Sequence, residues 1–415
     1  MLLSTLNPYS FIIAASLIII VSYFFNLLTQ RTNIPSVLLL IVLGVLIRQG
    51  LTLVGLEELN LFPVLEILGI VGLIMIVLEA ALDLKLTRDK WPIIWKSFTV
   101  AFLGVMGCMF LLALVIQAFI PSLDFLIAMI YATPLSIMSS AIIIPSVVNL
   151  DEDKKEFMIY ESTFSDILGI MCFYFILSNI EANSAVEVGV SVVGNILVTI
   201  VISFLVSYLM IYAFQKLNDG VKLFLLISVL LTLYSIGKLL HLSSLMIILV
   251  FGLILENPHL FIRGFLKKHI KQEQLASVFK DLKVVTIESS FVVRTFFFVI
   301  FGITISLSSL LSVRVVIVSF IALVLIYGLR YLLLKVIVRD FKPQVFIAPR
   351  GLISILLFFA IPEQYHVEDF ESGILLFVII VTSVIMAWSL IQSKKEKKMD
   401  IPSVVPVNNE VGKIG

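Results

Sequence analysis

Long apolar segments recur along the whole chain, separated by short polar connections. A helix needs about 20 apolar residues to cross the hydrocarbon core of a bilayer. Segments that meet or approach this length occupy residues 9–28, 35–49, 62–84, 93–119, 124–149, 156–180, 188–216, 221–239, 242–257, 284–306, 312–337, 344–362 and 371–391. The pattern predicts an all-α integral membrane protein with about 13 transmembrane helices. Because the second and ninth segments are short, twelve spans remain an alternative.

Composition supports the membrane prediction and narrows the function. The 415 residues are 60% hydrophobic and 14% charged, whereas a soluble domain is about 45–50% apolar and about 25% charged. A net charge of +1 gives no indication of nucleic-acid binding. The sequence contains no Gly-x-x-x-x-Gly-Lys-Ser/Thr phosphate loop and no His-Glu-x-x-His pair, which argues against ATP-driven pumping and zinc proteolysis. We therefore expect neither a cofactor nor enzymatic activity.

Lysine and arginine are distributed unequally between the two sets of alternate connections. One set and the C-terminal tail contain most of these residues, whereas the other set contains only Arg48, Lys238 and Arg314. By the positive-inside rule, the N-terminus lies outside and the C-terminus lies in the cytoplasm. The expected location is the plasma (inner) membrane. The basic connection 258–283 is predicted to be a helical connector near anionic lipid, and residues 392–415 are predicted to be disordered.

Two segments contain residues that interrupt helices. The fifth contains Thr133-Pro134 in mid-span, and the twelfth contains Pro349-Arg350-Gly351. Proline removes a backbone donor, so each site is either an interruption or an ordinary kink. Interrupted segments in corresponding positions of two halves are typical of an inverted-repeat transporter.

Charged and hydroxyl side chains are concentrated in the sixth segment. Glu161, Ser162, Ser165 and Asp166 lie within six consecutive residues of an otherwise apolar span. A charged residue at the centre of a membrane helix costs about 2.5–3.5 kcal/mol on insertion scales, so the cluster indicates a site for a cation, a proton or both. The two carboxylates lie about 140° apart on a helix, which favours different roles for them.

An arginine in the tenth span offers one of these carboxylates a partner. Arg294 stays charged and needs an anion within reach, and Glu161 is predicted to pair with it. Asp166 would then be the free carboxylate that binds a proton or a cation. Oxygens of Ser162 and of the backbone near Thr133 would complete the shell that hard cations prefer. The alternative is a purely structural ion pair, with Asp166 capping a kink.

Other charges inside the spans give weaker signals. Glu79 can approach the site from the third span, and Arg350 can offset the negative ends of half-helix dipoles. Lys96 and Arg330 lie near span ends, where long side chains can reach the interface, and no role is assigned to them.

The sixth-segment string resembles a family motif. Glu161-Ser-x-x-Ser165-Asp166 is similar to the Glu-Ser-x-x-Asn-Asp motif of monovalent cation–proton antiporters in the NhaP-like sodium/proton exchanger branch. Other stretches that resemble this family are Ile34–Gly44, Leu78–Asp83, Arg294–Gly302 and Arg350-Gly351. The resemblance extends over roughly residues 30–390.

This resemblance implies a homodimer with the inverted-repeat sodium/proton antiporter fold and two discontinuous crossing helices. Residues 1–90 and 219–308 would form the dimer scaffold, and residues 91–182 and 309–391 the moving core. Residues 183–218 would form a linker helix between them. In this division, helices one to three and eight to ten belong to the scaffold, helix seven is the linker, and helices four to six and eleven to thirteen belong to the core.

The resemblance also implies roles for site residues. Asp166 matches the carrier of the proton and cation, and Glu161 and Arg294 match an ion pair. The residues that match contributors to the ion site are Ser162, Glu79 and the backbone at Thr133; Ser165 is an additional candidate, and Pro134, Pro349 and Arg350 mark the helix crossing. The chain has Ser165 where the family usually has asparagine, and Thr133 where the Thr-Asp-Pro string of the family's fifth helix usually has aspartate. These departures make potassium an alternative to sodium at a site formed by Asp166, Ser162 and Thr133.

The predicted function is secondary antiport of a monovalent cation (sodium, lithium or potassium) against protons by alternating access. With one carboxylate free and the other paired, electroneutral exchange is expected. The alternatives are an organic-anion symporter of related architecture, a channel or membrane sensor, and a membrane-embedded enzyme.

Overall fold

A computed structural model of the chain describes residues 8–32, 34–53, 61–180, 198, 200–212, 222–239, 244–262, 272–304, 310, 312–367 and 370–399. Within these residues every regular element is a helix, and nine helical stretches are long and apolar enough to span a membrane. The all-α membrane class is therefore confirmed. The predicted seventh span is described only in part, as a helix over Ile200–Tyr212, so the count of thirteen is not established.

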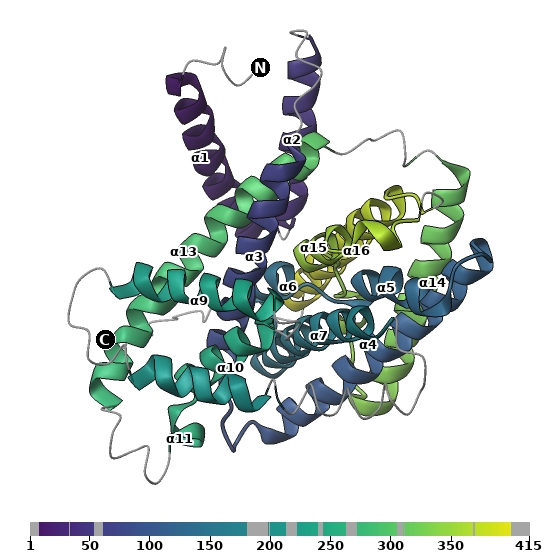
Figure 1. Cartoon of the computed structure of the whole chain (residues 1–415). Helices are drawn as coiled ribbons and strands as arrows, with labels where there is room; N and C mark the ends of the chain where they lie inside the picture. The colour runs from purple at the N-terminus through teal and green to yellow at the C-terminus, as the bar shows by residue number, and fades with distance from the viewer. Residues whose placement is uncertain are drawn as a thin grey trace, which may run out of the picture.

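The elements follow the predicted segments closely. They are α1 (Pro8–Thr32), α2 (Ser36–Leu53), α3 (Phe62–Asp83), α4 (Trp91–Phe119), α5 (Phe125–Ser136), α6 (Ser140–Ser146), α7 (Glu152–Asn179), α9 (Lys222–Leu239), α10 (Ser244–Glu256), α11 (Pro258–Phe261), α13 (Gln272–Thr304), α14 (Val313–Ile337), η3 (Gln344–Phe346), α15 (Leu352–Phe359), η4 (Glu363–Tyr365) and α16 (Gly373–Met399). Figure 1 shows the helices forming two groups, with α1 and the end of α2 projecting beyond them.

The first group contains α2, α3, α9, α10 and α13, and the second contains α4, α5, α6, α7, α14, α15 and α16. Within the first, α13 packs along α2 and α3, and α3 also packs on α10. Within the second, α4 packs against α5, α7 and α14. The groups meet where α3 contacts α7 and α15. The site described below lies at this junction.

Glycine permits the closest helix approach in the first group. A Cβ atom added to Gly44 of α2 would lie 2.8 Å from the Cα atom of Gly302 in α13. Membrane helices use small residues in this way because close backbone contact supplies the packing that association requires.

Both interruptions predicted from proline and glycine are confirmed. The fifth span divides into α5 and α6, and the helix ends after Ser136 rather than at Thr133-Pro134. The twelfth divides between η3 and α15. The extended segments touch, because the amide of Ser139 donates to the carbonyl oxygen of Pro349 at 2.9 Å. An added Cβ on Gly351 would lie 2.6 Å from the Ser139 hydroxyl oxygen, so this crossing has no room for a larger residue.

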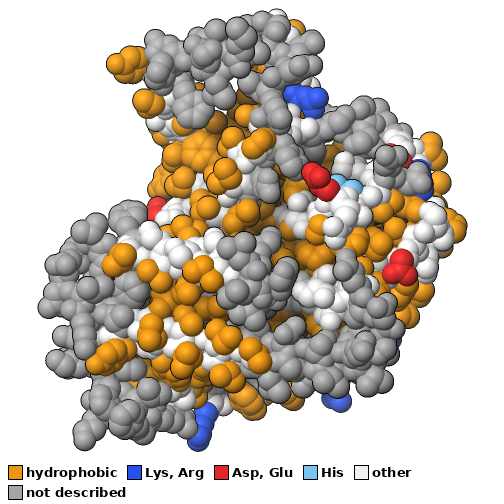
Figure 2. All heavy atoms as spheres, in the orientation of Figure 1, with side chains coloured by type: hydrophobic (Ala, Val, Ile, Leu, Met, Phe, Trp, Pro, Cys, Tyr) orange, Lys and Arg blue, Asp and Glu red, His pale blue; other side chains and the backbone are white. Residues whose placement is uncertain are grey.

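Two boundaries differ from the prediction. Helix α13 begins at Gln272, within the predicted 258–283 connector, and continues without interruption through the tenth span. Helix α16 continues to Met399, so residues 392–399 are helical rather than disordered, while 400–415 lie outside the described residues. Hydrophobic side chains cover most of the described surface visible in Figure 2, with few charged groups among them, as expected for contact with lipid.

Candidate ion-binding site

Asp166 lies in the middle of α7 and is buried, with 2% of its surface exposed. The backbone amide of Ser140, the first residue of α6, donates to its Oδ2 atom at 3.2 Å. Its Oδ1 atom has no hydrogen-bond partner among the described residues. Because an unpaired buried polar atom is costly, such an atom often marks a binding position. The sequence prediction thus correctly placed Asp166 beside a helix interruption.

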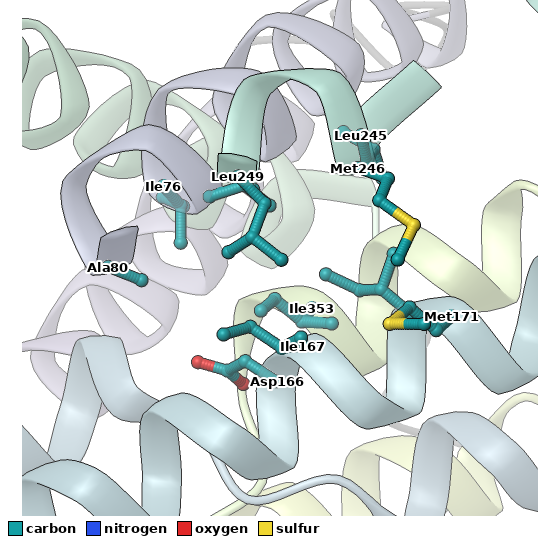
Figure 3. A pocket seen from close by; sticks show the side chains of 11 residues that line it. Ile76, Ala80, Asp166, Ile167, Met171, Leu245, Met246, Leu249 and Ile353 are labelled. Carbon is teal, nitrogen blue, oxygen red and sulfur yellow. The ribbon is translucent and has the colours of Figure 1, made fainter. Parts of the chain in front are cut away.

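A small apolar cavity of about 20 Å³ borders Asp166 on one side. Its other lining residues are Ile76, Val77, Ala80, Ile167, Ile170, Met171, Leu245, Met246, Leu249 and Ile353. Figure 3 shows the carboxylate directed away from Met171 and toward Ala80. An apolar lining offers no oxygen atoms to replace the water around a hydrated ion. Entry of an ion from this side is therefore unfavourable.

A second, larger cavity of about 260 Å³ lies on the other side of Ile76 and Ala80, which line both spaces. Its polar lining residues are Ser22, Asn26, Ser36, Glu79, Ser140, Arg294 and Thr295. This cavity is large enough for several water molecules. Glu79, Arg294 and Ser140 line this cavity, and Ser140 connects it to Asp166 through its backbone amide.

The second carboxylate of α7 is paired with an arginine that the sequence analysis set aside. Arg330 of α14 donates from Nη1 to Oε1 of Glu161 at 2.6 Å and from Nη2 to Oε2 at 3.0 Å. Both residues are buried. The predicted Glu161–Arg294 pair is therefore wrong. Arg330 does not extend to a membrane interface, because α14 turns this position toward α7.

Arg294 instead lies near Glu79, with its Nη2 atom 3.5 Å from Oε1 of that residue. The two side chains join α13 to α3 and both face the larger cavity. About a fifth of each side chain is exposed, so this pair is less buried than Glu161–Arg330. Glu79 thus lines the larger cavity next to the positively charged guanidinium of Arg294.

Arg350 occupies the helix crossing and is fully buried. Its Nε and Nη2 atoms donate to the carbonyl oxygens of Leu135 and Ser136 at 2.8 and 3.4 Å, and Nη1 donates to that of Ala348 at 2.7 Å. The first two carbonyls belong to the C-terminal end of α5, where the partial charge of the helix dipole is negative. This geometry agrees with the role predicted for Arg350.

The predicted hydroxyl ligands surround the same region in different ways. Ser165 accepts a hydrogen bond from the amide of Met138, between α5 and α6, at 3.0 Å. The hydroxyls of Thr133 and Ser162 donate to carbonyls of their own helices, those of Met129 at 2.7 Å and Ile159 at 3.2 Å. Pro134 lies in the last turn of α5, and Pro349 lies in the second interruption.

Sequence patterns assign no role to Arg330 and do not single out Ser140. Arg330 shares a helical stripe with the buried residues Ser319, Ala322 and Ile326, and small residues in such a stripe are a usable sign of helix contact. The signal for Ser140 was weaker, because a serine six residues after a mid-span proline has no distinctive pattern.

Comparisons with known proteins identify the family and the fold. A family model described as sodium/hydrogen exchanger, transmembrane, matches residues 14–392. No curated protein matches the sequence. The fold is similar to that of the sodium proton antiporter MjNhaP1 from Methanocaldococcus jannaschii at pH 8, with a TM-score of 0.70 and 18% identity over 94% of this chain and 98% of that one. An electron-microscopy structure of MjNhaP1 gives a TM-score of 0.64 at 18% identity, over 95% and 97% of the two chains.

The family match covers nearly the whole chain and confirms both the predicted family and the predicted exchange of a cation for protons. The structural match at this low identity supports the fold. The chain is therefore a multi-pass membrane protein that belongs to the sodium/hydrogen exchanger family.

Proposed function

We propose that this protein exchanges one monovalent cation for one proton at Asp166, with sodium as the expected ion and potassium as the alternative. The observation that carries the proposal is the buried Oδ1 atom of Asp166, which has no hydrogen-bond partner among the described residues and lies beside a small apolar cavity and close to a polar one. A proton and a monovalent cation each neutralise the Asp166 carboxylate, so the two compete for binding to it. The apparent KM for the cation therefore rises as the pH falls.

Electroneutral exchange follows from the state of the second carboxylate. Glu161 is buried against Arg330, so its charge is already balanced and it has no need of a transported ion. Of the two buried carboxylates of α7, Asp166 is then the exchangeable one. One cation replaces one proton, and no net charge crosses the membrane.

The cation ligands in this proposal are oxygen atoms around Asp166. Besides its carboxylate, these are the hydroxyls of Ser162 and Thr133 and the backbone near the end of α5, with Ser165 and Glu79 contributing to the surroundings. A hydroxyl that donates to its own helix still offers a lone pair to a cation. Oxygen ligands suit sodium and potassium alike, so selectivity depends on the number and distance of these atoms.

Alternating access in this proposal is a movement of residues 91–182 and 309–391 against residues 1–90 and 219–308, joined by residues 183–218. The larger cavity gives access from the cytoplasm, in keeping with the distribution of lysine and arginine. The protein acts as a homodimer in the plasma membrane, with the N-terminus outside. The apolar side of Asp166 is the closed route to the exterior.

Proton flux in proteoliposomes tests this function. Purified protein is given an inward-acid pH gradient, and sodium, potassium or lithium is added outside. Collapse of the gradient with one cation, at a rate unchanged when the membrane potential is clamped, is the expected result. Absence of cation-dependent proton flux at every pH at which the protein stays folded would contradict the proposal.

A further inference from the structure

Ser140 stands between the larger cavity and the carboxylate of Asp166. Its amide donates to Oδ2 of Asp166, and its hydroxyl lies beside the same carboxylate. Ser140 also lines the larger cavity, together with Glu79 and Arg294. Of the described residues that line this cavity, Ser140 is the one that hydrogen-bonds Asp166. A cation that passes from the cavity to Asp166 therefore encounters Ser140.

The other hydroxyls near the site are placed differently. Thr133 and Ser162 are buried, and neither belongs to the lining of the small apolar cavity or of the larger cavity. Their hydroxyls donate to carbonyls within α5 and α7. Ser139, the neighbour of Ser140, lines neither cavity: its amide donates to Pro349 at the helix crossing, and its hydroxyl lies on the side of Gly351. Ser140 is thus the hydroxyl in position to meet an arriving ion.

The chemistry of this position suits a cation ligand. A hard cation that leaves water needs oxygen atoms in exchange for its hydration shell. The Ser140 amide already donates to Oδ2 of Asp166. The Oδ1 atom, which no described residue hydrogen-bonds, and the Ser140 hydroxyl can therefore act together on one ion. We infer that the Ser140 hydroxyl is a cation ligand that receives the ion from the cavity and sets the apparent affinity for it. This inference rests on the proposed function, in which Asp166 is the carrier.

The two contributions of Ser140 can be separated by substitution. Ser140→Ala removes the hydroxyl and retains the backbone amide that bonds Asp166. The carrier then keeps its position and loses one oxygen ligand. A matched control is Ser146→Ala in the same short helix, because the Ser146 hydroxyl is also buried but donates to the carbonyl of Ile142 at 2.6 Å.

The test measures KM and maximal rate for sodium-driven proton flux in proteoliposomes for the wild type, Ser140→Ala, Ser140→Thr, Ser146→Ala and Asp166→Asn. Loss of one ligand contact should raise KM about 3- to 10-fold in Ser140→Ala with little change in maximal rate. Ser140→Thr retains a hydroxyl and should stay near the wild type, as should Ser146→Ala. A general loss of structure would instead lower the maximal rate in proportion to the active protein.

The outcomes separate this inference from the proposed function. A KM for Ser140→Ala within about twofold of the wild type, with Asp166→Asn inactive, would overturn the role of Ser140 and leave the carrier in place. Active Asp166→Asn would overturn the proposed function itself. If Ser140→Ala does not fold, Ser140→Cys replaces it, because a soft sulfur is a poor ligand for a hard cation. Equal KM values for Ser140→Cys and Ser140→Thr would then overturn the inference.

Discussion

Arg330 and Glu161 form a buried, two-point ion pair that joins α14 to α7, with nitrogen–oxygen distances of 2.6 and 3.0 Å. Arg330 also donates from Nε and Nη2 to the carbonyl oxygen of Gln344, at 3.0 and 2.8 Å. The guanidinium therefore connects α7 to the segment that precedes the second helix interruption. Breaking this pair leaves a charge with no water to replace the lost partner.

Removal of Arg330 should therefore be costly. We expect Arg330→Met to lower the free energy of unfolding by about 3–5 kcal/mol, the usual result of leaving one member of a buried pair alone. Arg294→Met is the matched control, and its more exposed pair with Glu79 should contribute about 1 kcal/mol or less. Thermal unfolding of the purified proteins in detergent measures both. Equal losses for the two variants would show that burial of the pair does not decide its contribution.

Arg350 should be needed to hold the helix crossing together. Arg350→Met leaves the carbonyls of Leu135 and Ser136 without these donors inside the protein. Because each unsatisfied buried acceptor costs about 1–3 kcal/mol, we expect a clear fall in thermal stability. Arg339→Met, at an exposed position of the same chain, is the control and should leave stability unchanged. A stable Arg350→Met protein would show that other donors can take over these carbonyls.

The Gly44–Gly302 contact predicts unequal effects of alanine along α2. Gly44→Ala inserts a methyl group against the backbone of α13, and overpacking of this kind costs about 1–3 kcal/mol. Gly50→Ala on the same helix meets no atom of the described residues within 4 Å and should be neutral or slightly stabilising. Unfolding temperatures of the two variants provide the comparison. A neutral Gly44→Ala would mean that the two helices can separate without loss.

The Glu79–Arg294 pair predicts a change in cation affinity rather than in maximal rate. In Arg294→Gln the carboxylate of Glu79 faces the larger cavity without its positive neighbour and should attract cations, which lowers the apparent KM. Glu79→Gln should raise KM, and Arg294→Lys should resemble the wild type. Flux measurements at low ionic strength give the largest difference, because salt screens the attraction. A KM that rises in Arg294→Gln would contradict this assignment.

The sequence predicted the spans, the two interruptions and the buried carboxylates because each follows from a local property. Apolar length determines a span, proline and glycine disrupt a helix, and a carboxylate in an apolar segment stands out by its cost. These are the features that placed Asp166 beside the first interruption. The close match of α3, α4 and α7 to the predicted segments has the same origin.

The partners of these residues could not be predicted in the same way. Arg294 of α13 and Arg330 of α14 each lie in a mostly apolar stretch, and a helical stripe that indicates a contact does not identify the partner helix. Arg330 faces Glu161 and Arg294 faces Glu79 because of how the two helix groups pack. The proximity of Ser140 to Asp166 likewise depends on the path of the chain between α5 and α6.

The most direct test of the central claim is sodium-dependent proton flux by Asp166→Asn beside Asp153→Asn in proteoliposomes. Both substitutions replace an aspartate of α7, but Asp153 is exposed in the first turn of the helix, whereas Asp166 is buried at the site. We expect Asp153→Asn to exchange sodium for protons like the wild type and Asp166→Asn to show no exchange while folding normally. Exchange by a folded Asp166→Asn protein would contradict the assignment of Asp166 as the carrier.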